Sequence, residues 1–292
     1  MSDYKPYLLM VLTTALWGGA FVAGKIALRE FPPMTLLFFR LLLATLVIIP
    51  ILYLREDSRF PEKRDIPLLF GLGLMGVSLF FVFQFFALIY TSASNASIIN
   101  ALNPLISSIL AQYLADESLS REKTLLLFIA FFGVLLTITN GDISAIINMN
   151  LDKGTLIMLL ATLCFSIYSV YSRKATRKYS PLFVTAYLLL FGLIQVTPLM
   201  IAEGVLPEVL YYSYSAWLCV VYLAVGSSVV GYLIQQDAIK KIGVNKTVLF
   251  NNLVTPFVMF FAFILLDETI TIINLFSAGI IILAVFSNSR LK

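Results

Sequence analysis

Amide and hydroxyl side chains recur at helical spacing within the most apolar stretches of this chain. Asn100, Asn103 and Ser107 stand at positions i, i+3 and i+7, which places them on one face of a helix. A later apolar stretch carries Asn251 and Thr255. Because amides and hydroxyls both donate and accept hydrogen bonds, such faces can bind a neutral or zwitterionic solute.

Aromatic rings and two glutamines extend the candidate site to other stretches of the chain. Aromatic walls suit an apolar side chain or ring of a solute. The candidate substrate-binding residues are therefore Thr13, Trp17, Phe21, Gln84, Asn100, Asn103, Phe165, Tyr168, Ser169, Gln235, Asn251 and Thr255. The alternative for the polar ones is a hydrogen bond between neighbouring helices in an apolar medium, worth about 0.6–2 kcal/mol. The alternative for the aromatic ones is packing or contact with lipid.

Residue types that many enzymes need are missing. The chain has no histidine, which excludes histidine-based serine or cysteine catalysis and histidine metal motifs. No Asp or Glu lies in the middle of an apolar stretch, so an aspartyl-protease pair is excluded as well. Cys164 and Cys219 lie inside apolar stretches and are interpreted as small buried hydrophobic residues. We therefore expect no catalytic residue, disulfide, metal or cofactor.

Composition indicates which elements must position the candidate residues. Hydrophobic residues make up 60% and charged residues 12% of the chain, with a mean hydropathy of +0.95, whereas soluble domains carry roughly 25% charged residues. The apolar stretches are about 17–23 residues long, which suits helices that span a bilayer. The first, Tyr7–Leu28, is too long for a signal peptide and is expected to be retained. We predict ten transmembrane helices near residues 7–28, 33–54, 66–88, 94–115, 123–140, 153–173, 181–202, 215–237, 246–266 and 270–288.

Basic residues divide unevenly between the two sides of these spans. The loops on the side of the N-terminus hold Lys5, Arg55, Arg59, Lys63, Arg64, Arg121, Lys123, Arg173, Lys174, Arg177, Lys178, Lys240, Lys241, Lys246, Arg290 and Lys292. The opposite loops hold only Lys25, Arg29 and Lys153. Because basic loops stay in the cytoplasm, both termini are predicted to be cytoplasmic. The net charge of +4 is then a bias of the membrane surface, and no nucleic-acid partner is expected.

Arg40 is the one cation well inside a predicted span. An isolated charge at this depth is costly unless it reaches water, a partner or a ligand. Three roles fit the sequence: reaching to the membrane surface, pairing with a helix end, or holding a substrate carboxylate.

The two halves of the chain repeat the same landmarks in the same order. When the halves are overlaid, Trp17 meets Phe165, Asn100 meets Asn251, and Pro33 meets Pro181. Each half holds five spans, and five is odd, so the second half enters the membrane from the opposite side. We predict two inverted five-helix repeats, at residues 1–145 and 146–292, an architecture that many transporters use around a site at mid-membrane.

The turns between spans carry their own signals. Thr91–Asn95 is expected to form a short hairpin, with Ser94 or Asn95 capping the following helix. Pro104 and Pro256 each remove a backbone hydrogen bond within a span, which predicts a kink there. Glu117 and Glu268, which end the fourth and ninth spans, are expected to cap the next helix or bond a turn amide.

The stretches LWGGAFVAGKIALREFPPMTLLFFR and QFFALIYTSASNASIINALNPL, together with the later LLDETIT, resemble the EamA-type transporters of the drug/metabolite transporter superfamily. The resemblance covers nearly the whole chain. It implies a basket-shaped bundle whose central cavity is lined mainly by the first, third, fourth, sixth, eighth and ninth spans. The fifth and tenth spans are then peripheral. Members that look like this export amino acids, related metabolites or unknown solutes.

These observations predict a transporter of small polar or amphipathic metabolites in the cell membrane. We expect export of amino acids, including aromatic or other apolar ones, by alternating access, through a monomer acting as facilitator or exchanger. The alternative is a proton-coupled exporter of drugs and organic cations, which would need a carboxylate within the membrane. An intramembrane enzyme lacks its residues, and a receptor would not explain the inverted repeat.

Overall fold

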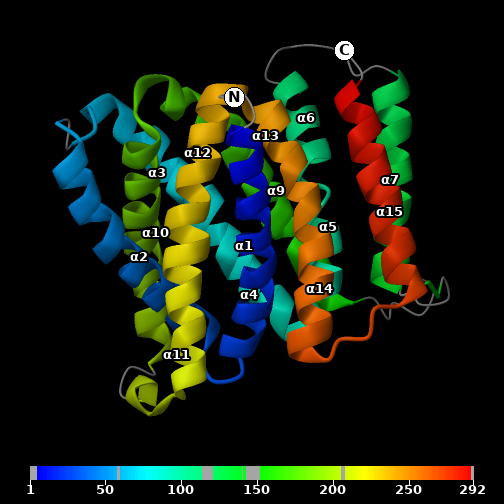
Figure 1. The fold of residues 1–292 in the computed structure, drawn as a ribbon, viewed down its shortest axis with the longest axis horizontal. Helices are drawn as coiled ribbons and strands as arrows, with labels where there is room; N and C mark the ends of the chain where they lie inside the picture. The colour runs from blue at the N-terminus through cyan, green and yellow to red at the C-terminus, as the bar shows by residue number, and fades with distance from the viewer. Residues whose placement is uncertain are drawn as a thin grey trace.

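The computed structural model describes residues 5–57, 60–113, 121–139, 141–142, 152–204 and 208–290. Within them the ordered elements are helices, and each predicted span corresponds to one helix or one run of helices (Figure 1). The first half comprises α1 (Lys5–Ala27), α2 (Pro33–Arg55), the run η1 (Lys63–Asp65), α3 (Ile66–Gly73), η2 (Leu74–Leu79) and α4 (Phe80–Tyr90), then α5 (Ala93–Asn100), α6 (Asn103–Tyr113) and α7 (Arg121–Thr139).

The second half repeats this order. It comprises α9 (Lys153–Lys178), α10 (Pro181–Glu203), η3 (Glu208–Tyr211), the run α11 (Tyr214–Val221), η4 (Tyr222–Val230) and α12 (Gly231–Ile242), the run α13 (Val244–Leu249), η5 (Phe250–Leu253) and α14 (Val254–Leu266), and α15 (Ile272–Arg290). Seven of these helices or runs are long and apolar enough to cross a membrane, and α7 and α15 hold shorter apolar stretches. The prediction of an all-α membrane fold is confirmed.

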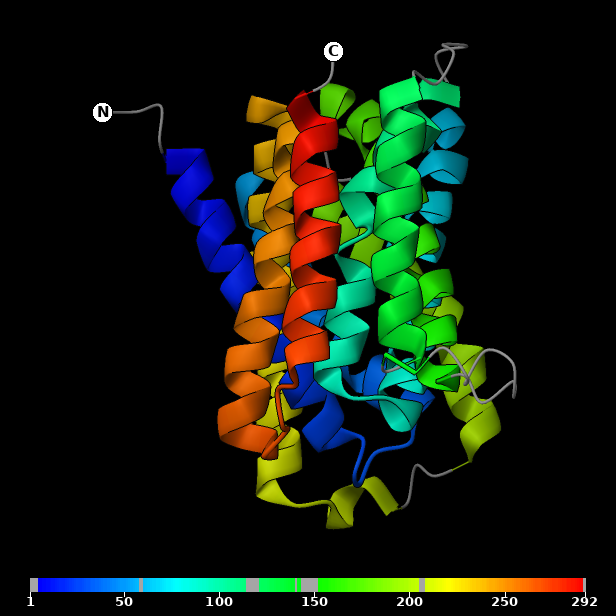
Figure 2. The ribbon, with the colours of Figure 1, turned by 90° about the vertical axis from the view of Figure 1, so that its right-hand side faces the viewer.

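The two halves lie antiparallel to each other. Both chain termini lie at one end of the bundle, here called the terminal end, and the opposite end is called the distal end (Figures 1 and 2). Helix α1 starts at the terminal end, whereas α9, its counterpart, starts at the distal end. Equivalent helices also make equivalent contacts across the halves. Helix α1 packs on α12 and α14, and its counterpart α9 packs on α4 and on the span formed by α5 and α6. This arrangement is an inverted repeat.

Two further pairs complete the bundle. Helix α2 packs along α10, and α7 packs along α15. Figures 1 and 2 show α7 and α15 side by side at the edge of the molecule, which agrees with their expected peripheral place. The buried side chains therefore concentrate among the other helices, where the two halves meet.

Irregular helix geometry recurs at equivalent places in the two halves. The third span contains a π-helical turn, η2, and the eighth contains another, η4. The fourth span is interrupted between α5 and α6, immediately before Pro104, and the ninth passes through the 3-10 turn η5 before Pro256. The expected irregularity at both prolines is therefore present. In a membrane, such irregular backbone is tolerated where it is covered by protein or faces a cavity.

Serine and aspartate side chains cap several helices. The cap of α5 is Ser92, whose hydroxyl accepts from the Asn95 N–H at 3.0 Å. The expectation that Ser94 or Asn95 would cap this helix is wrong, because α5 begins earlier and both residues lie within it. Ser94 instead bonds another element of the bundle, as described below.

The antiparallel arrangement predicts the labelling of two engineered cysteines. Arg177→Cys, near the end of α9, should react from one side of a sealed vesicle, and Tyr211→Cys, in η3, should react only from the other, because α10 runs between them. Both native side chains are exposed. The background is Cys164→Ala with Cys219→Ala, and the measurement is labelling by a membrane-impermeant maleimide. Reaction of both positions from the same side would contradict the fold.

Candidate functional site

A small cavity lies between the two halves. It is lined by residues of α1, α4, α5, α9, η4, α12, η5 and α14: Trp17, Ala20, Phe21, Phe80, Phe81, Gln84, Asn100, Phe165, Ser227, Tyr232, Asn251 and Val254. Of the predicted site residues, the structure brings together Trp17, Phe21, Gln84, Asn100, Phe165 and Asn251. The cavity volume is about 30 Å³, room for about two waters. This volume is too small for a metabolite.

Aromatic rings form most of the cavity wall. The rings of Trp17 and Phe165, which are counterparts in the two repeats, meet edge to face with centroids 6.1 Å apart. The ring centroids of Trp17 and Tyr232 are also 6.1 Å apart, and those of Phe80 and Phe165 are 4.7 Å apart. The indole N–H of Trp17 donates to the Ser227 carbonyl at 3.1 Å, which holds the ring in place. Such a wall suits an apolar or aromatic part of a solute.

Two asparagines present unpartnered acceptors at the cavity. The Oδ1 atoms of Asn100 and Asn251 are buried without a hydrogen-bond partner. The amide nitrogen of Asn251 has a partner, because Nδ2 donates to Asn103 Oδ1 at 3.1 Å. Asn103 in turn donates to Ser166 Oγ at 3.0 Å. Since buried polar groups usually find partners, the two free oxygens indicate positions where a donor on a solute can bind.

A second polar cluster lies on the neighbouring turns of α9 and α12. The Tyr168 hydroxyl donates to Gln235 Oε1 at 3.0 Å and accepts from Gln236 Nε2 at 2.5 Å. Ser172 donates to Gln236 Oε1 at 2.9 Å. Tyr168 and Gln235, both predicted site residues, thus join two helices and do not line the cavity. Gly76 leaves room for the tyrosine ring, since a Cβ at this position would lie 2.3 Å from it.

The remaining predicted residues also bond within the protein. Thr13 donates to the Leu9 carbonyl at 3.0 Å, and Ser169 donates to the Phe165 carbonyl at 2.8 Å, both within their own helices. Thr255 donates to the Ser97 carbonyl at 2.9 Å, which fastens α14 to α5. These hydroxyls are therefore committed to helix contacts, as Asn103 is.

Six cavity residues were not among the predicted ones: Ala20, Phe80, Phe81, Ser227, Tyr232 and Val254. Three of them carried a usable signal. Phe81 stands three residues before Gln84, and Tyr232 stands three residues before Gln235, so each shares a helix face with a glutamine. Ser227 lies beside Ser228 in an otherwise apolar run, and this polar pair was itself a signal.

The sequence matches one transporter family along nearly its whole length. The EamA-like transporter family matches residues 4–139 and again residues 152–290. The chain belongs to this family. It is accordingly a multi-pass membrane transporter of the drug/metabolite transporter superfamily.

Relatives of this EamA-like transporter carry the same general description. Uncharacterized transporter YyaM of Bacillus subtilis (strain 168) is 29% identical over 290 residues, which cover 99% of this chain and 95% of that protein. An uncharacterized transporter of Archaeoglobus fulgidus is 29% identical over 264 residues, 90% of each protein. A solved crystal structure with 21% identity superposes with a TM-score of 0.64 and covers 97% of this chain and 96% of that chain, which supports the fold.

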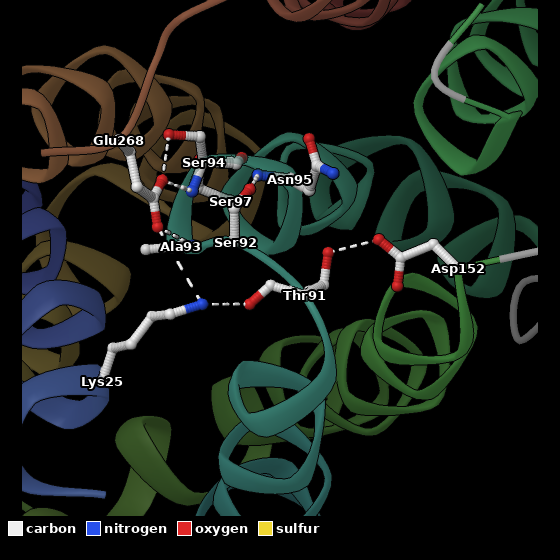
Figure 3. A network of polar contacts seen from close by, with 9 residues as sticks. All are labelled: Lys25, Thr91, Ser92, Ala93, Ser94, Asn95, Ser97, Asp152 and Glu268. Carbon is white, nitrogen blue, oxygen red and sulfur yellow. Dashed lines mark hydrogen bonds and ion pairs between the residues drawn. The ribbon is translucent and has the colours of Figure 1, made fainter. Parts of the chain in front are cut away.

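A polar network lies at the distal end of the transporter (Figure 3). The Glu268 carboxylate, just after α14, accepts from the N–H groups of Ala93 and Ser94 at 2.8 and 3.1 Å and from the Ser94 hydroxyl at 2.8 Å. The Lys25 ammonium, at the end of α1, lies 4.0 Å from Glu268 and donates to the Thr91 carbonyl. Of the two expected roles, capping the next helix or bonding a turn amide, Glu268 does not cap the next helix but bonds the first amides of α5 in the other repeat, directly after a turn. Glu117 lies outside the described residues.

The network continues to the start of α9 and to α15. The Thr91 hydroxyl donates to Asp152, whose other oxygen accepts from the Thr155 N–H at 3.1 Å and caps α9. Asn274, in α15, donates to Asn95 Oδ1 at 2.8 Å. Elements of both halves are thus tied together at the distal end.

Two more carboxylates bond helix N-termini at the distal end. Glu203 accepts from the N–H groups of Met34 and Thr35 at 2.9 and 2.7 Å, at the start of α2. Glu30 accepts from the hydroxyl and the N–H of Ser213, before α11, and these hydrogen bonds lower the pKa of the Glu30 carboxyl below its usual value. A carboxylate at a helix N-terminus satisfies free amides and faces the positive end of the helix dipole.

Removing the Glu268 carboxylate should loosen the distal end. Glu268→Ala should lower the stability of the purified transporter by about 1–3 kcal/mol, because three hydrogen bonds to α5 are lost. The measurement is the thermal unfolding midpoint in detergent. The control is Glu208→Ala, which removes an exposed carboxylate at the same end and should change stability by less than about 0.5 kcal/mol. Equal midpoints for both variants would show that the capping contacts contribute nothing.

Proposed function

We propose that this protein exports amino acids, especially those with aromatic or other apolar side chains, by alternating access as a facilitator or exchanger. The observation that carries the proposal is the cavity between the inverted halves, which combines an aromatic wall with the unpartnered Oδ1 atoms of Asn100 and Asn251. Amide oxygens can accept hydrogen bonds from an ammonium group. The rings suit the apolar side chain of the same solute.

The contacts between the halves support alternating access. The distal end is held by hydrogen bonds and an ion pair among α1, α5, α14 and α15, and these groups lie at helix ends rather than in the hydrophobic core. The Lys25 and Glu268 side chains are 28% and 12% exposed, so their ion pair can be exchanged for contacts with water. We infer that they release together when the distal side opens, while the helices move as units.

A proton-coupled exporter of organic cations is the second candidate. The aromatic wall favours it, because rings attract cations through their π faces. Exchange of protons for cations needs a carboxylate that faces the cavity. Among the described residues, no Asp or Glu side chain is buried, and the one buried charge belongs to Arg40. This positive charge disfavours a cationic solute at the same site.

We further propose the cytoplasmic membrane as the location, with both termini in the cytoplasm, on the basis of the basic loops at the terminal end. One chain supplies both repeats and all walls of the cavity. A monomer is therefore the proposed working unit.

Transport by the purified protein in liposomes tests the substrate class. Labelled phenylalanine, leucine and other amino acids should exchange across the membrane faster than in protein-free liposomes, since the cavity wall is apolar with amide acceptors. The comparison is a labelled lipophilic cation in the same vesicles. Flux of the cation without flux of any amino acid would favour the second candidate.

Removing the cavity amides tests the site. Gln84→Ala and Asn100→Ala should each lower amino-acid flux about tenfold, the effect expected from one lost hydrogen bond to a solute. Their folded yield in detergent should stay close to that of the unsubstituted protein. The control is Thr185→Ala, which removes a buried hydroxyl that bonds only its own helix, at Pro181. If both amide variants fail to fold, these amides serve helix packing instead.

A further inference from the structure

Arg40 is buried in the bundle without a counter-charge. Its side chain, on α2, is 1% exposed. Its Nε donates to Ser228 Oγ at 2.8 Å, one Nη donates to Ser227 Oγ at 3.1 Å, and the guanidinium carbon lies 3.6 Å from the centroid of the Phe81 ring. Among the described residues no carboxylate lies within ion-pair distance of it.

These contacts exclude two of the three roles that the sequence left open. The side chain does not reach the membrane surface, because it is buried. It does not pair with a helix end either, because Ser227 and Ser228 lie inside the continuous run from α11 to α12. A tie between two helices does not need a charge, and a buried guanidinium held by two neutral hydroxyls costs several kcal/mol. The charge itself therefore needs an explanation.

Two of the three groups that touch the guanidinium also line the cavity. Phe81 and Ser227 are both wall residues. The positive charge is thus in direct contact with two residues of the cavity wall. In a water-poor interior, the electrostatic attraction between such a nearby positive charge and an anionic solute in the cavity is only weakly screened.

The two serines differ in how their own protons are used. Ser228 accepts from Arg40 and donates to the Leu223 carbonyl at 2.9 Å, so its hydroxyl is satisfied. Ser227 accepts from Arg40, and no acceptor for its own proton occurs among the described residues. Because the guanidinium occupies an acceptor position of the oxygen, the Ser227 proton remains available to a group in the cavity, polarised by the charge behind it.

Two other donors at the cavity are already in use, whereas no hydrogen bond of the Gln84 or Asn100 amide nitrogen occurs among the described residues. The Trp17 N–H donates to the Ser227 carbonyl, and the Tyr232 hydroxyl donates to the Gly76 carbonyl at 2.6 Å. The unpartnered Asn100 and Asn251 oxygens are acceptors and come from α5 and η5, whereas the charged corner is built by α2 and η4. The donors backed by the positive charge and the two unpartnered amide oxygens therefore come from different elements of the bundle.

We propose that Arg40 and Ser227 form an anion subsite of the cavity, which binds the carboxylate of the transported solute. The inference rests on the proposed transport function and narrows its substrate class to carboxylates. For an amino acid, the carboxylate lies toward Arg40 and Ser227, the ammonium toward the asparagine oxygens, and the side chain against the rings.

Four probes each carry one phenyl ring and differ in whether they have a carboxylate, an ammonium group or both. They are L-phenylalanine, L-phenylalaninamide, phenethylamine and 3-phenylpropanoate. Trp17 reports binding, because its ring lines the cavity and the chain has one other tryptophan, removed by Trp217→Phe. In this full-length background in nanodiscs, the two carboxylates should change Trp17 fluorescence at concentrations about tenfold or more below those needed for the amide and the amine. Equal affinity for phenylalanine and its amide, or no saturable response to any probe, would overturn the proposal.

Two substitutions then locate the subsite. Arg40→Gln should weaken phenylalanine binding about tenfold or more and abolish the preference over the amide. Ser227→Ala keeps the charge and should reduce the preference severalfold, so it serves as a second test where Arg40→Gln fails to fold. The control is Ser78→Ala, a buried serine of the π-helical turn η2 that bonds Gln195 away from the cavity. An undiminished preference for phenylalanine over its amide in folded Arg40→Gln protein would overturn the proposal. Where Arg40→Gln is not obtained folded, an undiminished preference in Ser227→Ala would overturn it.

The same probes in transport assays keep this inference distinct from the proposed function. Flux of 3-phenylpropanoate without flux of phenylalanine would contradict amino-acid export and support the anion subsite. Equal flux of phenylalanine and its amide would support amino-acid transport and contradict the subsite.

Discussion

The hydrocarbon core of a bilayer offers no hydrogen-bond partners, so each polar group on a spanning helix must find one inside the protein or face a cavity. In this chain the constraint gathers amides and hydroxyls where the two halves meet. Most of them hydrogen-bond to one another between helices: Asn103 bonds Ser166, and Tyr168 bonds Gln235 and Gln236. Among the buried side-chain atoms that remain without a partner, the Oδ1 atoms of Asn100 and Asn251 belong to residues of the cavity wall.

The inverted repeat brings equivalent parts of the two halves to this place. Each half contributes a π-helical turn and an interrupted helix. These are η2 and α5–α6 in the first half, and η4 and α13–α14 in the second. Irregular backbone of this kind is protected because the partner half covers it. The distal end is held by contacts of a different nature: carboxylates at helix N-termini, such as Glu268 on α5, are strong enough to order the ends and exposed enough to exchange with water.

Hydropathy, spacing and repetition predicted much of this architecture. The spans, their antiparallel halves and the breaks at Pro104 and Pro256 follow from properties that are local in the chain. The overlay of the halves marked Trp17 and Phe165 as equivalent positions, and the structure adds that their rings contact each other. The cap of α5 at Ser92 and the cap by Glu268 across the repeats did not follow, because several neighbouring polar residues could each satisfy the same amides.

By itself the sequence determined that this is a helical membrane protein with two inverted halves, because apolar length and basic loops act through the solvent and need no knowledge of contacts. It also indicated which polar residues were unusual. Only the tertiary structure decided their partners. Arg40 had three open roles, and its contacts with Ser227, Ser228 and Phe81 depend on how α2 is rotated against η4 and α4. That rotation is set by packing between residues far apart in the chain, which no local pattern records.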